Sequence, residues 1–164
     1  MLSVTLGCMS SGKTTALIQR QVEGIHLILD YDTTNSKQPY PSSLFSHDEV
    51  SISCYKTKTL DIDISVADVI SINEAQFFPD LIPFIKSALK QNKKVYIYGL
   101  DGDFKQDPFG QMLELLPMAD EYIKLYAICK CGERAAFSKR MSATKEQYAP
   151  HDEYQASCRT CLRV

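Results

Sequence analysis

The segment Gly7-Cys-Met-Ser-Ser-Gly-Lys-Thr14 matches the pattern G-x-x-x-x-G-K-[ST] and is the stretch that decides the expected fold. It follows a short β-rich run, residues 2–6, and precedes residues 13–23, whose apolar spacing is helical. Glycines let the backbone wrap closely around a phosphate, and a helix N-terminus adds partial positive charge. The pattern therefore predicts a phosphate-binding loop in which Lys13 bridges the β- and γ-phosphates and the Thr14 hydroxyl holds Mg²⁺.

Strand-like and helix-like segments alternate along the chain after this loop. The expected strands are residues 25–29, 50–55, 66–72, 95–98 and 122–128, and the expected helices are residues 81–91 and 111–116. Residues 33–49, rich in serine, proline and asparagine, are expected to form a long surface loop. The alternation predicts an α/β fold like that of P-loop NTPases, with a mostly parallel sheet and helices on both of its faces.

Composition narrows the class of protein. The net charge is −2 and the sequence has no basic block, so it lacks the clustered positive charge that is typical of nucleic-acid-binding proteins. The apolar runs are far shorter than the ~20 residues that span a bilayer, so we expect no membrane partner. Strand-like sequence begins almost at once after Met1, which favours a cytoplasmic protein without a targeting peptide.

The cysteines are unevenly distributed. Cys8 and Cys54 stand apart, whereas the other four cluster near the C-terminus as the pairs Cys129-Lys-Cys131 and Cys158-Arg-Thr-Cys161. Clustered cysteines without a secretory signal are more often metal ligands than disulfides, and four thiolates suit tetrahedral zinc. We expect a structural zinc site in a small C-terminal lobe, residues 129–164, after an α/β domain of residues 1–128. Four reduced thiols without metal are the alternative, and His151 is a substitute ligand.

Several segments together resemble the type II thymidine kinases, the cellular cytosolic and poxvirus-like enzymes. They are Gly7–Thr14, Asn73–Asp80, Leu100–Phe104 with Pro108–Gly110, Ala135–Arg140 and Tyr154–Cys161. The resemblance implies transfer of the γ-phosphate of ATP to the 5′-hydroxyl of thymidine, giving dTMP in nucleotide salvage, with deoxyuridine as a further acceptor. It also implies ATP, Mg²⁺ and structural Zn²⁺ as cofactors, inhibition by dTTP, a homotetramer, and a substrate-binding lasso loop at about residues 141–154.

The resemblance assigns roles to individual residues. Glu74 would be the general base that accepts the proton of the 5′-hydroxyl, and Arg140 would stabilise phosphate charge. The ATP-binding set would be Gly7, Cys8, Met9, Ser10, Ser11, Gly12, Lys13, Thr14, Thr15, Asn73 and Gln76. The substrate-binding set would be Met9, Asp32, Phe77, Leu100, Phe104, Phe109, Arg140, Tyr148 and Tyr154. The alternatives are a solvated strand-end carboxylate for Glu74, core packing for the apolar residues and a solvent-facing Arg140.

Three features of the sequence depart from the family pattern. Asn73 replaces an acidic residue of the Mg²⁺ shell, Thr34 stands where the family has an arginine, and Ala149-Pro150 replaces a Gly-Gly pair. These changes motivate a second hypothesis, a nucleotide-binding or regulatory protein with weakened catalysis. A third hypothesis, a zinc-ribbon nucleic-acid binder, fits the acidic net charge less well.

Overall fold

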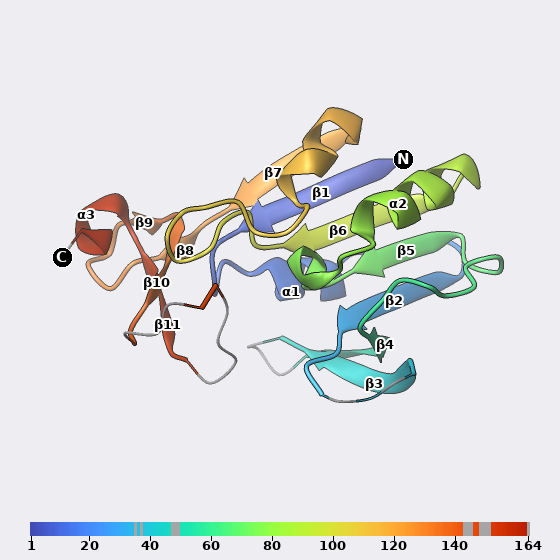
Figure 1. Ribbon diagram of the computed structural model, residues 1–164, viewed down its shortest axis with the longest axis horizontal. Helices are drawn as coiled ribbons and strands as arrows, with labels where there is room; N and C mark the ends of the chain where they lie inside the picture. Colours follow the sequence, from blue (N-terminus) through green and yellow to red (C-terminus); the bar gives the residue numbers. More distant parts are fainter. Residues whose placement is uncertain (35, 37, 47–49, 143–145, 148–151, 164) are drawn as a thin grey trace.

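The computed structural model describes residues 1–34, 36, 38–46, 50–142, 146–147 and 152–163, and Figure 1 shows their arrangement. Its centre is a seven-stranded sheet with the strand order β3-β4-β2-β5-β6-β1-β7. All neighbours pair in parallel except β3 and β4, which pair in antiparallel orientation. The strands are β1 (Leu2–Gly7), β2 (His26–Tyr31), β3 (Tyr40–Phe45), β4 (Ser51–Thr57), β5 (Val69–Ile72), β6 (Lys94–Gly99) and β7 (Glu121–Leu125).

Helices α1 (Lys13–Ile18) and α2 (Leu81–Lys90) pack on opposite faces of this sheet. Leu81, Phe84 and Ile85 of α2 are buried in the larger core cluster, together with the strand residues of β1 and β5 on that face. Leu17 of α1 lies in the second cluster with Ile28 and Tyr98. Each fully buried side chain of this size contributes about 1.5–3 kcal/mol, so burial of alternate strand residues on both faces accounts for the layered fold. The predicted mostly parallel sheet is confirmed.

The C-terminal part of the chain forms a small lobe beyond the carboxyl ends of β1, β6 and β7 (Figure 1). It contains two antiparallel pairs, β8 with β9 and β10 with β11, and one short helix. Its elements are β8 (Ala127–Ile128), β9 (Arg134–Ala135), β10 (Phe137–Arg140), β11 (Tyr154–Ser157) and α3 (Arg159–Leu162).

The structure corrects several predicted boundaries. Residues 40–45, predicted to lie in a loop, form β3 at the edge of the sheet. Pro41 is tolerated there because an edge strand has one side without ladder hydrogen bonds, and Leu44 is buried. The predicted helix 13–23 ends at Ile18, and the strand predicted to start at residue 66 begins at Val69.

Two further segments differ in type. The predicted helix 111–116 is a 3₁₀ helix, η2 (Leu113–Met118), which contains Pro117. The predicted strand 122–128 divides into β7 and β8 on either side of Tyr126. β7 continues the main sheet, whereas β8 pairs with β9 in the lobe, so the chain leaves the large sheet at this residue.

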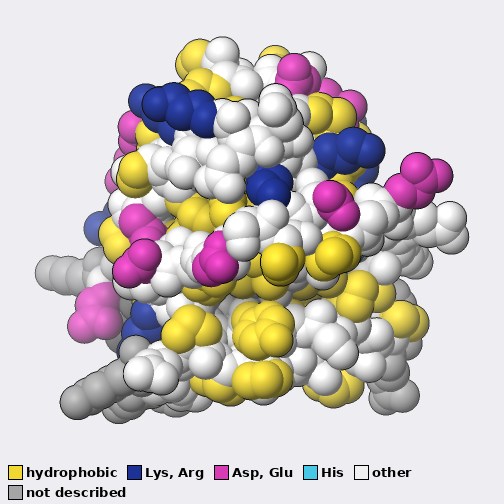
Figure 2. Space-filling view, turned by 90° about the vertical axis from the view of Figure 1, so that its right-hand side faces the viewer, with side chains coloured by type: hydrophobic (Ala, Val, Ile, Leu, Met, Phe, Trp, Pro, Cys, Tyr) yellow, Lys and Arg dark blue, Asp and Glu magenta, His cyan; other side chains and the backbone are white. Residues whose placement is uncertain are grey.

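The face at the amino ends of the parallel strands lies opposite to the lobe and carries hydrophobic side chains, which gather in the lower half of Figure 2. Ile25 and Val66, which precede β2 and β5, are 60% and 72% exposed. They line a cavity of about 420 Å³. Among the described residues, no helix has the length and apolar character needed to cross a bilayer. The glycine-rich loop and the four clustered cysteines lie at the other end of the sheet.

Candidate functional site

A cavity of about 310 Å³ opens at the carboxyl ends of the parallel strands. Ligands bind at this edge in open α/β sheets. Ten of the residues expected at a site line it: Met9, Thr14, Asn73, Glu74, Gln76, Phe77, Leu100, Phe104, Phe109 and Tyr154. Residues that sequence reasoning did not select line it too, among them Asp30, Tyr31, Lys56, Asp103, Ser138 and Gln147. The cavity thus combines segments far apart in the chain.

The loop from Gly7 to Thr14 connects β1 to α1, as its sequence predicts. Lys13 is only 7% exposed, and its Nζ donates a hydrogen bond to the carbonyl oxygen of Cys8 at 2.7 Å. Burial lowers the pKa of Lys13, and the negative charge of Glu74 acts in the opposite direction. A Cβ at Gly7 would lie 2.5 Å from Ser11 Oγ, so this turn has no room for a side chain. The loop is closely wrapped around the buried ammonium group of Lys13, and this arrangement suits the binding of an anion.

The C-terminal lobe contacts this loop directly. Met9 N–H donates to Ser138 Oγ of β10 at 2.9 Å, and the Cys8 thiol donates to the Ala135 carbonyl oxygen at 3.4 Å. Cys8 also packs in a buried cluster with Cys129 and Cys158. The position of the loop therefore depends on the fold of the lobe. The remaining loop residues of the expected ATP set (Gly7, Cys8, Ser10, Ser11, Gly12, Lys13 and Thr15) are not among the residues that line the 310 Å³ cavity.

Glu74 follows β5 and Asn73 in a left-handed backbone conformation, with φ 50° and ψ 39°. Such a conformation is unfavourable for a non-glycine residue and persists where the surroundings determine it. Gln76 Nε2 donates to Glu74 Oε2 at 2.6 Å, and Gln76 Oε1 accepts from Leu100 N–H at 3.0 Å. Gln76 is 3% exposed. Its amide thus joins the carboxylate to the end of β6 and sets the direction of Glu74.

An aromatic wall forms one side of the cavity. The rings of Tyr31 and Phe77 lie 5.0 Å apart at an interplanar angle of 30°, and Phe77 meets Phe109 edge to face at 5.3 Å. Offset and edge-to-face pairs of this kind are favourable and hold the rings in fixed directions. Leu100 and Phe104 also line this cavity. The wall offers flat apolar surface of the type that binds a planar ring.

Asp32, expected at the acceptor site, does not line the cavity. Its carboxylate accepts hydrogen bonds from the backbone N–H and hydroxyl of Thr34 and from the Tyr40 hydroxyl. These bonds keep the pKa of Asp32 below its usual value, although burial acts in the opposite direction. Asp30 lines the cavity in its place, with Lys56 3.3 Å away. Sequence reasoning missed Asp30, although a carboxylate directly after the apolar run Leu27–Leu29 was a usable signal.

Arg140 is also absent from the cavity lining, and its side chain is 1% exposed. Its guanidinium pairs with Asp152 at 3.1 Å, donates to the Tyr154 hydroxyl and to the Glu146 carbonyl oxygen, and lies 4.0 Å from the centre of the Phe104 ring. Glu146, Asp152 and Tyr154 belong to the described parts of the segment predicted to be the lasso loop, whereas Phe104 lines the cavity. Arg140 therefore fastens this segment to the cavity wall. Tyr148, Ala149, Pro150 and His151 lie outside the described residues.

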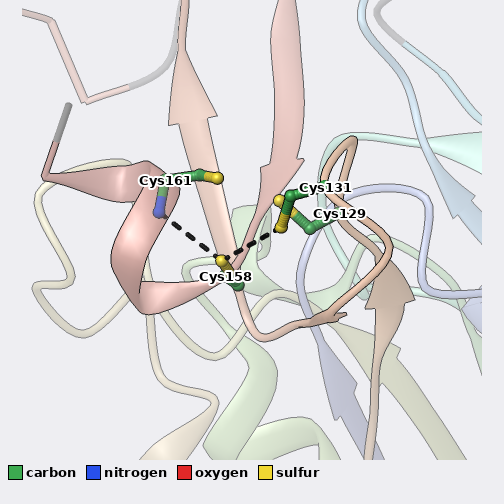
Figure 3. A group of neighbouring side chains, drawn as sticks. All are labelled: Cys129, Cys131, Cys158 and Cys161. Atoms are coloured by element: carbon green, nitrogen blue, oxygen red, sulfur yellow. Dashed lines mark hydrogen bonds between the residues drawn. The ribbon is translucent and has the colours of Figure 1, made fainter.

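The four C-terminal cysteines converge, as Figure 3 shows. Their sulfur atoms all lie within 4.8 Å of one another, and all four are free thiols. Cys131 Sγ and Cys158 Sγ are 3.7 Å apart. This distance agrees with the ~3.8 Å between sulfur atoms that Zn–S bonds of ~2.3 Å give in a tetrahedron. The hairpin between β8 and β9 carries one pair, and the beginning of α3 carries the other. The C-x-C spacing therefore does not prevent all four thiols from meeting, and the donor set fits zinc.

The fold and site together define a mixed α/β protein with a phosphate-loop sequence, a strand-end carboxylate and an aromatic cavity at one edge of its sheet. The family model described as thymidine kinase matches residues 1–162. The chain is similar to the thymidine kinase of Variola virus, at 36% identity, and to those of Monkeypox virus (strain Zaire-96-I-16) and Vaccinia virus (strain Ankara), each at 35% identity. Each similarity covers 98% of this chain and 95% of the relative. The chain belongs to the thymidine kinase family.

Proposed function

We propose that this protein is an ATP-dependent thymidine kinase, which transfers the γ-phosphate of ATP to the 5′-hydroxyl of thymidine, with deoxyuridine as a further acceptor. Membership of the family supports the reaction. The single structural observation that carries the proposal is that Glu74, Thr14 and the aromatic wall line one cavity at the edge where the glycine-rich loop begins. A carboxylate, a metal-binding hydroxyl and a surface for a base thus share one space.

The proposed roles follow from chemistry. The loop N–H groups and Lys13 hold the triphosphate, while Glu74 accepts the proton from the 5′-hydroxyl. The 5′-oxygen then forms a bond to the γ-phosphorus as the bond from that phosphorus to the β,γ-bridging oxygen breaks, releasing ADP. Mg²⁺ at the Thr14 hydroxyl supplies neutralisation of phosphate charge when it is bound. One positioned base contributes about 10²–10⁴ in rate.

The acceptor is proposed to lie with its base along the rings of Phe77 and Phe109 and beside Leu100. Met9, Phe104 and Tyr154 complete this pocket, and Tyr148 is retained in it on the family resemblance. Three of the expected roles change. Asp30 replaces Asp32 at the cavity, and Arg140 becomes a positioning residue for Glu146, Asp152 and Tyr154. Gln76, expected to bind ATP, is proposed to orient Glu74.

The C-terminal lobe, which was expected at residues 129–164 and begins with β8 at Ala127, is proposed to bind structural Zn²⁺ through Cys129, Cys131, Cys158 and Cys161. Because the lobe contacts Cys8 and Met9, metal binding would support the phosphate loop as well as the lasso segment. The α/β part that precedes this lobe would carry the catalytic groups. A homotetramer and inhibition by dTTP are parts of the proposal that rest on the family alone. A P-loop NTPase-like fold and a cytoplasmic location are also proposed, and both rest on the sequence patterns as well.

The test is phosphorylation of thymidine by the purified, zinc-replete protein with ATP and Mg²⁺. Glu74→Gln keeps the shape of the side chain and removes the base, so we expect turnover to fall about 10²–10⁴-fold. Glu114→Gln, an exposed carboxylate on η2 outside the cavity lining, is the matched control and should behave like the unchanged protein. Binding of thymidine and ATP without turnover in the unchanged protein would instead support the regulatory hypothesis that Asn73 motivates.

A further inference from the structure

Mg²⁺ in phosphate-loop enzymes is held between the loop hydroxyl and an acidic residue at the end of a nearby strand. In this chain the residue between β5 and Glu74 is Asn73, whose amide carries no charge. Asn73 is 4% exposed and lines the same cavity as Thr14. The site therefore has the hydroxyl that the metal requires and no acid at position 73.

An acid lies on the neighbouring strand instead. β2 and β5 are parallel neighbours with Leu29 opposite Ile72, so the next residues of the two chains, Asp30 and Asn73, lie side by side. Asn73 Nδ2 donates to Asp30 Oδ1 at 2.8 Å. Ile28, two residues before Asp30, belongs to the same core cluster as Leu17 of α1, and strand residues two apart share a face. Asp30 thus lies on the face of the sheet that α1 covers, and α1 is the helix that carries Thr14.

The carboxylate has a counter-charge. Lys56 stands opposite Asp30 in the register of β2 and β4, and Lys56 Nζ lies 3.3 Å from Asp30 Oδ2. The Asp30 side chain is 7% exposed and that of Lys56 is 28% exposed. A charge this deeply buried is costly unless it is paired. Lys56 also lines the cavity, so the pair faces the space in which phosphates and metal would lie.

We propose that Asp30 supplies the negative charge for Mg²⁺ that position 73 lacks, acting through Asn73 or a water as a positioning residue, and that Lys56 balances this charge in the absence of metal. The inference rests on the proposed function, because it assigns a role within the same site. It names the strand β2, rather than the end of β5, as the source of the acidic group. It also gives Lys56 a role that no motif suggests.

The experiment measures metal binding rather than turnover. Mn²⁺ is titrated into the zinc-loaded protein with ADP, and bound metal is followed by electron paramagnetic resonance. Residues that orient metal ligands are worth about 10–100-fold in affinity, so Asp30→Asn should weaken Mn²⁺ binding by that factor. ADP affinity measured in EDTA separates this effect from any change in nucleotide binding itself. Asp120→Asn, a carboxylate that accepts from Leu2 N–H at the opposite end of the sheet, is the matched control and should bind Mn²⁺ normally.

A swap separates charge from structure. The double variant Asp30→Asn/Asn73→Asp exchanges the carboxylate and the amide across the same hydrogen bond and should recover Mn²⁺ affinity. Lys56→Gln removes the ammonium that competes with the metal for the Asp30 carboxylate, so it should tighten Mn²⁺ binding. If Asp30→Asn fails to fold, the Lys56→Gln variant tests the proposal by itself. Unchanged Mn²⁺ affinity in Asp30→Asn, a swap that recovers nothing, or weaker binding in Lys56→Gln would each overturn the inference. If these variants behave as expected but the unchanged protein does not phosphorylate thymidine, the proposed function fails and the metal assignment stands.

Discussion

Replacing Gln76 with methionine tests whether the amide of this side chain sets the direction of Glu74. Methionine has nearly the same length and volume, so the substitution removes two hydrogen bonds without opening a large cavity. The bonds lost are those from Gln76 Nε2 to Glu74 Oε2 at 2.6 Å and from Leu100 N–H to Gln76 Oε1 at 3.0 Å. Gln76→Met therefore separates positioning from packing.

The size of the effect on stability follows from burial. Gln76 and Leu100 are 3% and 6% exposed, so water does not replace the lost acceptor and the Leu100 N–H is left unsatisfied. An unsatisfied buried donor costs about 1–3 kcal/mol, and the partly exposed Glu74 adds less because water can solvate it. A loss of about 2 kcal/mol lowers the melting temperature by about 4–8 °C in a protein of this size.

The effect on the reaction should be larger. Freed from Gln76, the Glu74 carboxylate can turn away from the acceptor hydroxyl, and a misplacement near 1 Å costs about 10²-fold in rate. We expect kcat for thymidine to fall by this factor while KM changes little, because the aromatic wall remains. Initial rates and thermal unfolding of the same preparation measure both quantities. Gln91→Met, at an exposed amide that donates to Ser87 Oγ at 3.4 Å, is the matched control. The usual kcat in a Gln76→Met protein that shows the expected drop in melting temperature would refute the positioning role.

Three further predictions use other parts of the molecule. Gly110→Ala should lower the free energy of unfolding by more than about 1–3 kcal/mol, because φ at this residue is 56° and a Cβ would clash with the carbonyl oxygen of Gln76. Chemical denaturation measures this loss, and an unchanged midpoint would contradict it. Asp32→Asn should cost about 1–3 kcal/mol at pH 7. The pKa of Asp32 lies below its usual 3.8 in the folded protein, so the stabilisation by its carboxylate is complete above that value and is lost as the pH falls through the folded pKa. In acid unfolding experiments, the unfolding free energies of Asp32→Asn and of the unchanged protein should therefore converge. A constant difference down to pH 2 would count against the assignment. Cys158→Ser should lower the zinc content measured by mass spectrometry and weaken ATP binding as well, since Cys158 packs in one cluster with Cys8 of the loop; loss of zinc with normal ATP affinity would show that the two sites are independent.

Local sequence is sufficient to predict those features of the site that are formed by residues close together in the chain. The loop from Gly7 to Thr14 joins a strand to a helix as predicted, because glycine placement and the apolar patterns on either side are short-range features. Glu74 lies one residue beyond the end of the buried strand β5, close to where its sequence context predicts a strand-end carboxylate. The cysteine pairs were recognised as one site from their clustering in the chain, and the structure brings their sulfurs together.

Tertiary structure decided what these residues contact. Asp30 and Asp32 differ by two positions and would share a face if β2 continued, but the strand ends at Tyr31 and Asp32 turns back to accept from Thr34 N–H two residues on. Arg140 found its partners in Asp152, Tyr154 and Phe104, which no local pattern connects to it. The edge strand β3 forms in a segment whose composition predicts a loop. Its pairing with β4 and the burial of Leu44 stabilise a strand that the local sequence alone does not favour.

The sequence by itself therefore determined the α/β class, the glycine-rich loop between a strand and a helix, the carboxylate near the end of β5 and the thiol cluster. Only the tertiary structure decided which carboxylate faces the cavity, which cation fastens the lobe and how Gln76 is used. The physical reason is that backbone conformation follows from patterns within a few residues. The direction and the partner of a polar side chain depend instead on strands and loops that meet it from distant parts of the chain.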